Sequence, residues 1–458
     1  KLTNQNIIFF PIDTVSRELE WQLFLALELK KKYGVGACIG HKYIITQIHK
    51  QSQNCIWLGR LPTNHGRSKR DKAIVKTGRG NNTTFIFLHD EGAFYPVHNY
   101  EQSVLQIHPV DTFNELDNYH FLTWGEEQRK IVQKKANTSK HNVTVSGMPR
   151  FDLFKPHNHW WDQHNVDFIK NKFGDFILII TKFGNANSSE HNVGLISEKY
   201  LEANKILNDP ERRKDYFQRW QQDQKDFSAY VVMMQQVIEA MPKIQFVIRP
   251  HPSEDSSFYQ QVFGYYDNVK IIREGDVRPW IKSCRALIHT GCTTGVEAVL
   301  ADKKVVNYVP HQNKLYSIAI AEEAGYIAKS VNDVLELLDT VEQGSPHFSD
   351  RSMQKLFNLS DNSVQKTEEV VKKYLSNNGA HASISIDSGL VRKLKWEKNK
   401  LNDKKNAKLR GIKTGDFGRS IRLSAIPRNQ IEAQIDIFNK HNGTNIKPKV
   451  LDKNLIVI

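Results

Sequence analysis

The stretch that decides the fold is IRPHPSE at residues 248–254, followed by IHTGCTTGVEA at residues 288–298. Each half is typical of a buried strand that ends in a turn, and the second turn opens a helix. The first backbone N–H groups of a helix lack partners within it, and the helix dipole adds partial positive charge there. The two turns therefore predict a phosphate site in an α/β protein.

Side chains around these turns complete a predicted nucleotide site. His251 can add a ring N–H from the neighbouring strand end. Glu297 lies one helical turn inward, where its carboxylate can accept hydrogen bonds from ribose hydroxyls. The other residues predicted to bind the nucleotide are Arg249, Pro252, Thr290, Gly291, Thr293 and Thr294. The glycines do not form a GxGxxG pattern, so NAD is not predicted.

Short apolar runs alternate with helical patterns along most of the chain. Strands are predicted at residues 6–11, 35–39, 55–58, 84–88, 120–124, 143–145, 176–181, 245–249, 269–272, 286–289 and 304–308. Long helices are predicted at residues 216–241 and 361–375. This alternation favours parallel sheets wound on both faces. We expect two doubly wound Rossmann-like domains with a cleft between them, the α/β architecture called GT-B.

The domain boundary is expected where Pro, His, Asn and Trp interrupt the pattern, at residues 156–167. The expected division is a first Rossmann-like domain at residues 1–157, a second at 158–345, closing helices at 346–380 and a basic C-terminal extension at 381–458. Of the net charge of +14, the extension carries +10, from 17 Lys and Arg against 7 Asp and Glu. We expect it to meet an acidic partner such as an anionic membrane surface, with a solvated tail as the alternative.

Composition limits the class of protein. The chain has 458 residues, 39% of them hydrophobic, and a mean hydropathy of −0.53, which is typical of a soluble protein. It shows neither an apolar run long enough to cross a bilayer nor a signal peptide at its beginning. The four cysteines lack CxxC spacing, so reduced thiols and a cytoplasmic location are expected.

Asp90, Glu91 and Gly92 follow a predicted strand of the first domain and are the strongest candidate for acid chemistry. Adjacent carboxylates in a cleft repel each other, and partial burial raises a pKa further. One carboxylate can then transfer a proton or attack a substrate while the other orients it. An ordinary solvated turn is the alternative.

Taken in order, these motifs resemble those of a known group of enzymes. Bacterial sialyltransferases, which have a GT-B fold, carry an acidic pair before Gly, then His-Pro, then a Ser/Thr pair. A closer resemblance is to bacterial surface carbohydrate biosynthesis proteins, which include retaining β-Kdo transferases. The resemblance spans roughly residues 5 to 310 and also rests on residues 11–14, 17–20, 124–127, 147–152, 273–276 and 279–280.

The resemblance implies a glycosyltransferase that moves Kdo (3-deoxy-manno-octulosonic acid) from CMP-Kdo to a surface glycan or lipid-linked glycan, without a metal or other cofactor. It implies that His251 contacts the CMP phosphate and that Glu91, with Asp90 as the alternative, is the acidic residue that acts in catalysis as nucleophile or base. Lys182, Gly184 and Asn185 are candidate contacts to the donor sugar, and Lys182 or Arg249 can pair with its carboxylate. No Asp-x-Asp of the kind that holds a metal-bound nucleotide accompanies these motifs.

The sequence leaves alternatives open. The anomeric configuration can be retained through a covalent adduct or inverted with Glu91 as base, and the nearer family retains. The donor can be a CMP-sialic acid or a CDP-polyol instead of CMP-Kdo, and a nonenzymatic polyanion-binding protein is a rival of another class. Nucleic acid is not an expected partner, because the extension has few aromatic residues among its charges, namely Trp396, Phe417 and Phe438.

Overall fold

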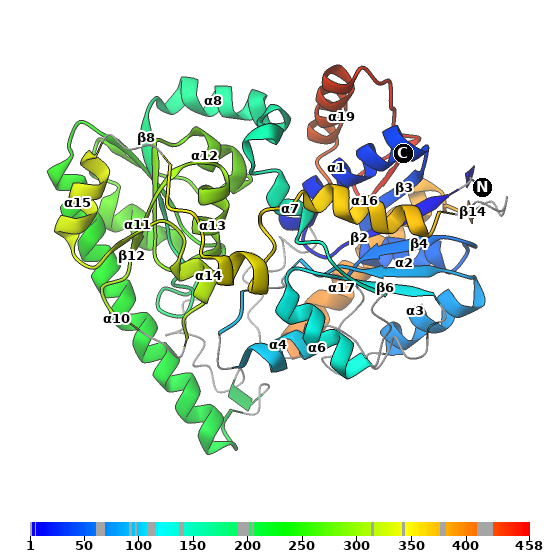
Figure 1. Ribbon diagram of the computed structural model, residues 1–458, viewed down its shortest axis with the longest axis horizontal. Coiled ribbons are helices and arrows are strands. Elements are labelled where there is room, and N and C mark those ends of the chain that lie inside the picture. Colours follow the sequence, from blue (N-terminus) through cyan, green and yellow to red (C-terminus); the bar gives the residue numbers. More distant parts are fainter. Residues whose placement is uncertain are drawn as a thin grey trace.

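The computed structural model describes the chain except for residues 1, 5, 61–68, 91–93, 97–98, 108–115, 117, 137–141, 190–200, 203–205, 313–315, 341–343, 376–381 and 410–424. Two sheets with helices on both faces form two lobes that lie side by side (Figure 1). The predicted class, two doubly wound Rossmann-like α/β domains in a GT-B arrangement, is confirmed.

The first domain contains an eight-stranded sheet in the order β15-β16-β3-β2-β4-β5-β6-β7. Its six parallel strands, all predicted from apolar runs, are β2 (Ile7–Ile12), β3 (Gly36–His41), β4 (Ile56–Gly59), β5 (Thr84–Phe87), β6 (Tyr119–Thr123) and β7 (Val143–Val145). Its main helices are α1 (Val15–Tyr33), α2 (Lys42–His49), α3 (Lys69–Gly80), α4 (Tyr100–Ile107), α6 (Glu126–Ala136) and α7 (Pro149–Asp152).

Alternate side chains of β2 enter two separate cores. Ile8 and Phe10 pack with the apolar face of α1, whereas Ile7 and Phe9 pack with α2 on the other side of the sheet. This alternation follows from the two-residue period of a strand, and burial on both faces explains why the strand is an unbroken apolar run.

The second domain has six parallel strands in the order β10-β9-β8-β11-β12-β13. They are β8 (Phe176–Ile180), β9 (Gln245–Arg249), β10 (Val269–Ile271), β11 (Ala286–His289), β12 (Lys304–Tyr308) and β13 (Tyr326–Ala328). The helices are α8 (Gln163–Phe173), α10 (Pro210–Ala240), α11 (Ser256–Phe263), α12 (Val277–Ser283), α13 (Thr293–Leu300), α14 (Ala319–Glu322) and α15 (Val331–Asp339). The direction of winding reverses between β8 and β11, and such a reversal is where open α/β sheets bind ligands.

The chain crosses between the domains twice. The 3-10 helix η3 (Pro156–Asp162) leads into the second domain, close to the expected boundary. Later, α16 (Ser363–Lys373) returns to the first domain, where the carboxylate of Asp152 accepts the backbone N–H of Val364 at 2.7 Å. The closing helix predicted at residues 361–375 is therefore confirmed, and it closes the first domain.

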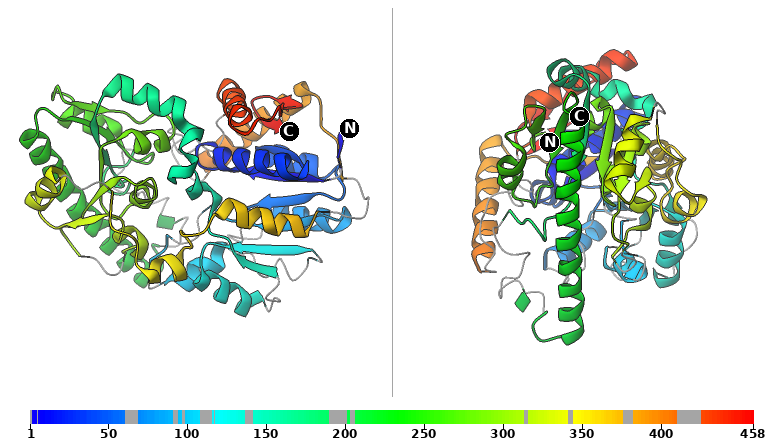
Figure 2. Two further views of the ribbon diagram at one scale, coloured as in Figure 1. Left: turned by 45° about the horizontal axis from the view of Figure 1, so that its top comes forward. Right: turned by 90° about the vertical axis from the view of Figure 1, so that its left-hand side faces the viewer.

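The basic segment at residues 381–458 is built into the first domain. Its elements are β14 (Ala382–Ile384), α17 (Gly389–Leu409), α19 (Arg428–Asn442), β15 (Val450–Leu451) and β16 (Leu455–Val457). Strand β16 pairs antiparallel with β3 and extends the main sheet, while β14 pairs with β1 (Leu2–Asn4). Helix α19 lies beside α1, where Phe438 contacts Phe24 (Figure 2). In the described part of the chain, every helix is too short or too polar to span a bilayer.

Candidate functional site

A cavity of about 500 Å³ lies between the two domains and is called here the interdomain cavity. From the first domain it is lined by Thr14, Ser16, Arg17, Glu20, Trp21, Arg150 and Phe154. From the second domain the predicted residues that line it are Lys182, Arg249, His251, Pro252, Gly291, Thr293, Thr294 and Glu297. The cavity brings together most of the predicted nucleotide site, on the loops that follow β8, β9 and β11.

The floor of the cavity is the point where the winding of the second sheet reverses. The loops after β8 and β11 meet there, and the ammonium group of Lys182 lies 3.4 Å from the carbonyl oxygen of Gly291. The amide of Asn307 on β12 holds the same turn, because its Oδ1 accepts the N–H of Gly291 at 2.8 Å. Gly291 has a φ of 51°, a left-handed conformation that other residues seldom adopt.

Hydrogen bonds of His289 hold the start of the helix that faces the cavity. Helix α13 begins at Thr293, after the N-cap residue Cys292. His289 Nδ1 accepts the N–H of Cys292 at 3.1 Å, and its Nε2 lies 2.8 Å from the carbonyl oxygen of Ala324, so this histidine is satisfied within the core. A Cβ at Gly295 would lie 2.2 Å from the His289 ring, which explains the glycine.

His251 presents one ring nitrogen to the cavity. Its Nδ1 accepts the backbone N–H of Ser253 at 3.2 Å and lies 2.7 Å from Ser253 Oγ, an arrangement that places the ring proton on Nε2. Enclosure by the cavity walls and the charges of Arg17 and Arg273 lower the pKa of His251. At pH 7 the ring is therefore neutral and offers an Nε2–H donor.

A buried carboxylate, Glu254, anchors the loop of His251, and sequence reasoning assigned it no role. Its Oε1 accepts Thr181 Oγ1–H at 2.5 Å and the backbone N–H of His251 at 3.2 Å, while its Oε2 accepts Tyr259 O–H at 2.5 Å. These bonds tie the loop after β9 to the end of β8. The signal for this role was its position three residues after His251.

Arg249 and Pro252 line the cavity but are engaged by the loop at residues 273–275. The Arg249 guanidinium donates to the carbonyl oxygens of Glu274 at 3.0 Å and Gly275 at 2.8 Å. The Arg273 guanidinium in turn donates to the carbonyl oxygen of Pro252. Arg249 thus holds the cavity wall.

Glu297 joins the two domains at the cavity. Its Oε1 lies 3.2 Å from Nη1 of Arg150, which belongs to the first domain, and both side chains line the cavity. Burial raises the pKa of Glu297, against the opposing effect of the Arg150 charge. The carboxylate therefore faces the ligand space while it is held by a single close cation from the other lobe.

Three predicted positions lie away from the interdomain cavity. Thr290 lines a smaller neighbouring cavity of about 70 Å³. Gly184 packs against Ser253, whose Oγ would lie 2.0 Å from a Cβ at this position. Asn185 donates its side-chain amide to Asp223 of α10 at 2.6 Å. Gly184 and Asn185 therefore hold the loop after β8 through contacts that lie away from the interdomain cavity.

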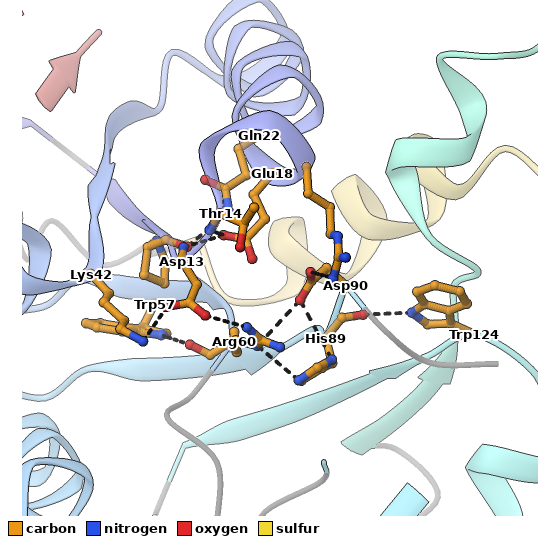
Figure 3. A network of polar contacts seen from close by, with 12 residues as sticks. Asp13, Thr14, Glu18, Gln22, Lys42, Trp57, Arg60, His89, Asp90 and Trp124 are labelled. Atoms are coloured by element: carbon orange, nitrogen blue, oxygen red, sulfur yellow. Dashed lines mark hydrogen bonds and ion pairs between the residues drawn. The ribbon is translucent and has the colours of Figure 1, made fainter. Parts of the chain in front are cut away.

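Asp90 lies in a buried polar network beside the cavity (Figure 3). Its carboxylate is 3.3 Å from Arg17, 3.4 Å from Arg60 and 3.7 Å from the ring of His89. Burial alone would raise its pKa, but Arg60, His89 and Arg17 outweigh burial and hold the pKa well below the usual value. Asp90 is thus a firmly ionised carboxylate, and Glu91 and Gly92 lie outside the described residues.

Glu18 in the same network has the opposite character. It is buried on α1, and its Oε2 accepts the backbone N–H of Asp13 at 2.5 Å. Burial, followed by the negative charge of Asp90, raises its pKa well above the usual value. Asp13 itself pairs with Lys42 and Arg60 (Figure 3). The network therefore holds two carboxyl groups with opposite pKa shifts, lowered for Asp90 and raised for Glu18, a difference that no sequence motif predicts.

The charge of the interdomain cavity favours an anion. Its cationic side chains are Arg17, Lys182, Arg150, Arg249, Arg273 and Arg278, and its acidic ones are Glu20, Asp276 and Glu297. Among the described residues, no group of three or more His, Cys, Asp or Glu is placed to hold a metal ion. An anion entering here would meet the start of α13 and the Nε2–H of His251 together.

The class that the fold defines is a two-domain Rossmann-like protein of GT-B type. A structure of the wall teichoic acid polymerase TagF, soaked with CDPG, is similar over 81% of this chain and 88% of that one, with 10% identity and a TM-score of 0.45. The UDP-GlcNAc 2-epimerase of Methanocaldococcus jannaschii is similar over 80% and 99%, with 9% identity and a TM-score of 0.48. No family profile and no curated protein sequence matches the chain.

Proposed function

We propose that the chain is a glycosyltransferase that moves a Kdo residue from CMP-Kdo to a surface glycan acceptor. The observation that carries the proposal is the convergence of the start of α13, the Nε2–H of His251 and the carboxylate of Glu297 on one cavity between two Rossmann-like domains. The ribose, phosphate and sugar of a nucleotide donor would then follow one another across the cavity, with the sugar directed toward the first domain.

The departing phosphate is the first chemical task. As the bond from the anomeric carbon to the phosphate oxygen breaks, its electron pair passes to CMP. The N–H groups of Thr293 and Thr294 and the neutral His251 donor stabilise that charge without being ionised themselves. In this proposal the charge needs no metal ion, in keeping with the expectation from sequence.

The carboxylate of the Kdo sugar needs a cation of its own. Arg249 is occupied by backbone carbonyl groups, so of the two predicted candidates Lys182 is the better placed. Its ammonium lies between the interdomain cavity and the turn at Gly291. We therefore propose that Lys182 binds the carboxylate of the donor sugar.

The acidic side chain that serves the sugar is proposed to be Glu91. Asp90, the alternative, is held ionised by Arg17, Arg60 and His89, and a carboxylate with so low a pKa is a weak base and a weak nucleophile. Glu91 follows it directly in the chain. Retention would use Glu91 as nucleophile, and inversion would use it to take the proton of the acceptor hydroxyl.

Release of CMP from three donors tests the proposal: CMP-Kdo, CMP-sialic acid and CDP-glycerol. We expect turnover or slow hydrolysis with CMP-Kdo alone. Glu91→Gln should lower this rate by about a thousandfold while CMP still binds, because one acid-base or nucleophilic group contributes on that order. Glu101→Gln, a change of an exposed glutamate in α4, is the matched control and should leave the rate unchanged. Turnover with CDP-glycerol alone would contradict glycosyl transfer and would indicate phosphoryl transfer instead.

A further inference from the structure

Helix α17 lies on the outside of the first domain and has one packed and one open face. It contacts α2, and in the right-hand view of Figure 2 it is the orange helix along the margin of the molecule. Trp396 fixes the inner face, because its buried ring meets His41 edge to face at 4.8 Å between centroids. The other face of the helix has no such partner among the described residues.

Several cationic side chains of α17 form ion pairs within the fold. Arg392 is buried and pairs with Asp452, and Lys395 lies 2.5 Å from Asp387. Lys400 lies over the ring of Trp396 and pairs at 3.5 Å with Glu397, whose exposed side chain lies between Leu394 and Leu401 on the outer side of the helix. These charges are therefore neutralised within the fold.

The open face carries a stripe of leucines. Leu390, Leu394 and Leu401 expose 70%, 63% and 66% of their surface, and Val391 beside them exposes 38%. Positions four and seven residues apart fall on one side of a helix, so the three leucines form one row roughly 16 Å long. Single exposed leucines need no explanation, but a row of three on one helix does.

Lysines flank this row. Lys393, Lys398 and Lys405 are exposed on the same side, and no acidic partner is recorded for them within the described residues. A helix with apolar side chains along its centre and lysines at its borders can lie in the interface of a bilayer, where the apolar groups enter the acyl region and the cations meet anionic headgroups.

The rest of the basic segment exposes fewer apolar side chains that could contact a membrane. Strands β14 and β16 are paired, and the apolar side chains of α19 (Ile431, Ile435 and Phe438) are buried. We propose that the open face of α17, with Leu390, Leu394 and Leu401 at its centre, docks the protein on an anionic membrane surface. This inference does not depend on the reaction that the interdomain cavity supports.

Sedimentation with lipid vesicles tests this inference on the full chain. The protein should bind vesicles that contain about one-third phosphatidylglycerol and bind pure phosphatidylcholine vesicles far less. The triple variant Leu390→Ser, Leu394→Ser, Leu401→Ser should weaken binding at least about tenfold, because three apolar side chains no longer enter the acyl region. Changing Lys393, Lys398 and Lys405 to Gln should weaken it on the order of fivefold per lysine.

A matched variant uses exposed apolar residues of the second domain. Phe168→Ser, Tyr265→Ser, Ile327→Ser removes side chains that are 61%, 68% and 56% exposed, and it should bind vesicles as the wild type does. Equal binding by the leucine variant and the wild type would overturn the inference. The inference would also fail if the wild type did not bind vesicles but formed a dimer that the leucine variant converted to a monomer. That result would assign the open face of α17 to a second copy of this chain. Binding of RNA through the lysines alone would also overturn it.

Discussion

Arg150 and Glu297 meet across the domain boundary, with 3.2 Å between Nη1 and Oε1, at the wall of the interdomain cavity. Arg150 lies in α7, just before the chain crosses to the second domain, and Glu297 lies in the second turn of α13. One ion pair therefore links the domain crossing to the helix whose start faces the predicted phosphate.

Removing the cation of this pair should destabilise the fold. Arg150→Met leaves the buried Glu297 carboxylate without its close partner, and we expect a loss of about 3 kcal/mol at pH 7. Chemical denaturation measures the loss. The double variant Arg150→Met, Glu297→Gln removes both charges and should recover most of it. A double variant no more stable than Arg150→Met would contradict the pairing.

Glu20 should make stability depend on pH. Burial, opposed by Arg278 and reinforced by Asp276, raises the pKa of Glu20 to about 7. A carboxyl group with a raised folded-state pKa stabilises the fold below its unfolded pKa, and this contribution is lost as the pH rises through the folded value. As the pH rises from 4.5 to 8, the free energy of unfolding of Glu20→Gln should therefore increase relative to that of the wild type by up to about 3 kcal/mol.

Unfolding curves of the wild type and Glu20→Gln at both pH values measure this gain. Glu432→Gln, which removes a partly exposed carboxylate on α19, is the control for the loss of a glutamate charge at the protein surface. A constant difference between the wild type and Glu20→Gln across this range would show that Glu20 does not titrate there.

Gly295 should tolerate no side chain. A Cβ at this position would lie 2.2 Å from the His289 ring, which is itself fixed by Cys292 and Ala324. We expect Gly295→Ala to cost about 1–3 kcal/mol, the usual range for overpacking, and to weaken CMP binding by displacing the start of α13. Gly80→Ala adds a Cβ that meets nothing within 4 Å and should be neutral. The melting temperatures of both variants check this prediction.

The strands of both domains could be predicted because burial on two faces turns them into continuous apolar runs, as in residues 176–180 and 286–289. Helix α10 begins at Pro210, earlier than the predicted residue 216, because the carboxylate of Asp209 caps it by accepting the backbone N–H groups of Glu211 and Arg212. Strands β13 and β16, of three residues each, were not predicted.

The site could be predicted only in part. The turns at His251 and Thr293 directly follow β9 and β11, which flank β8 in the sheet, so their carboxyl ends meet at one cavity. Arg17 and Arg150 reach that cavity through the packing of one domain on the other, which no local pattern encodes. The ionised state of Asp90 likewise depends on Arg60 from the loop after β4, as well as on its neighbour in the chain, His89.

The segment at residues 381–458 shows the same limit. Its charge predicted a basic extension beyond the two domains. Strand β16 instead completes the first sheet beside β3, and Ile431 and Phe438 enter its core with α1. We therefore expect removal of residues 381–458 to unfold the first domain, and point variants are the better test of this segment.

Titration calorimetry with CMP tests the central claim most directly. We predict that the wild type binds CMP, that His251→Ala weakens binding about tenfold through loss of the Nε2–H donor, and that His164→Ala in α8 does not. The absence of binding heat with any cytidine nucleotide, or equal CMP affinity in His251→Ala and the wild type, would contradict the account.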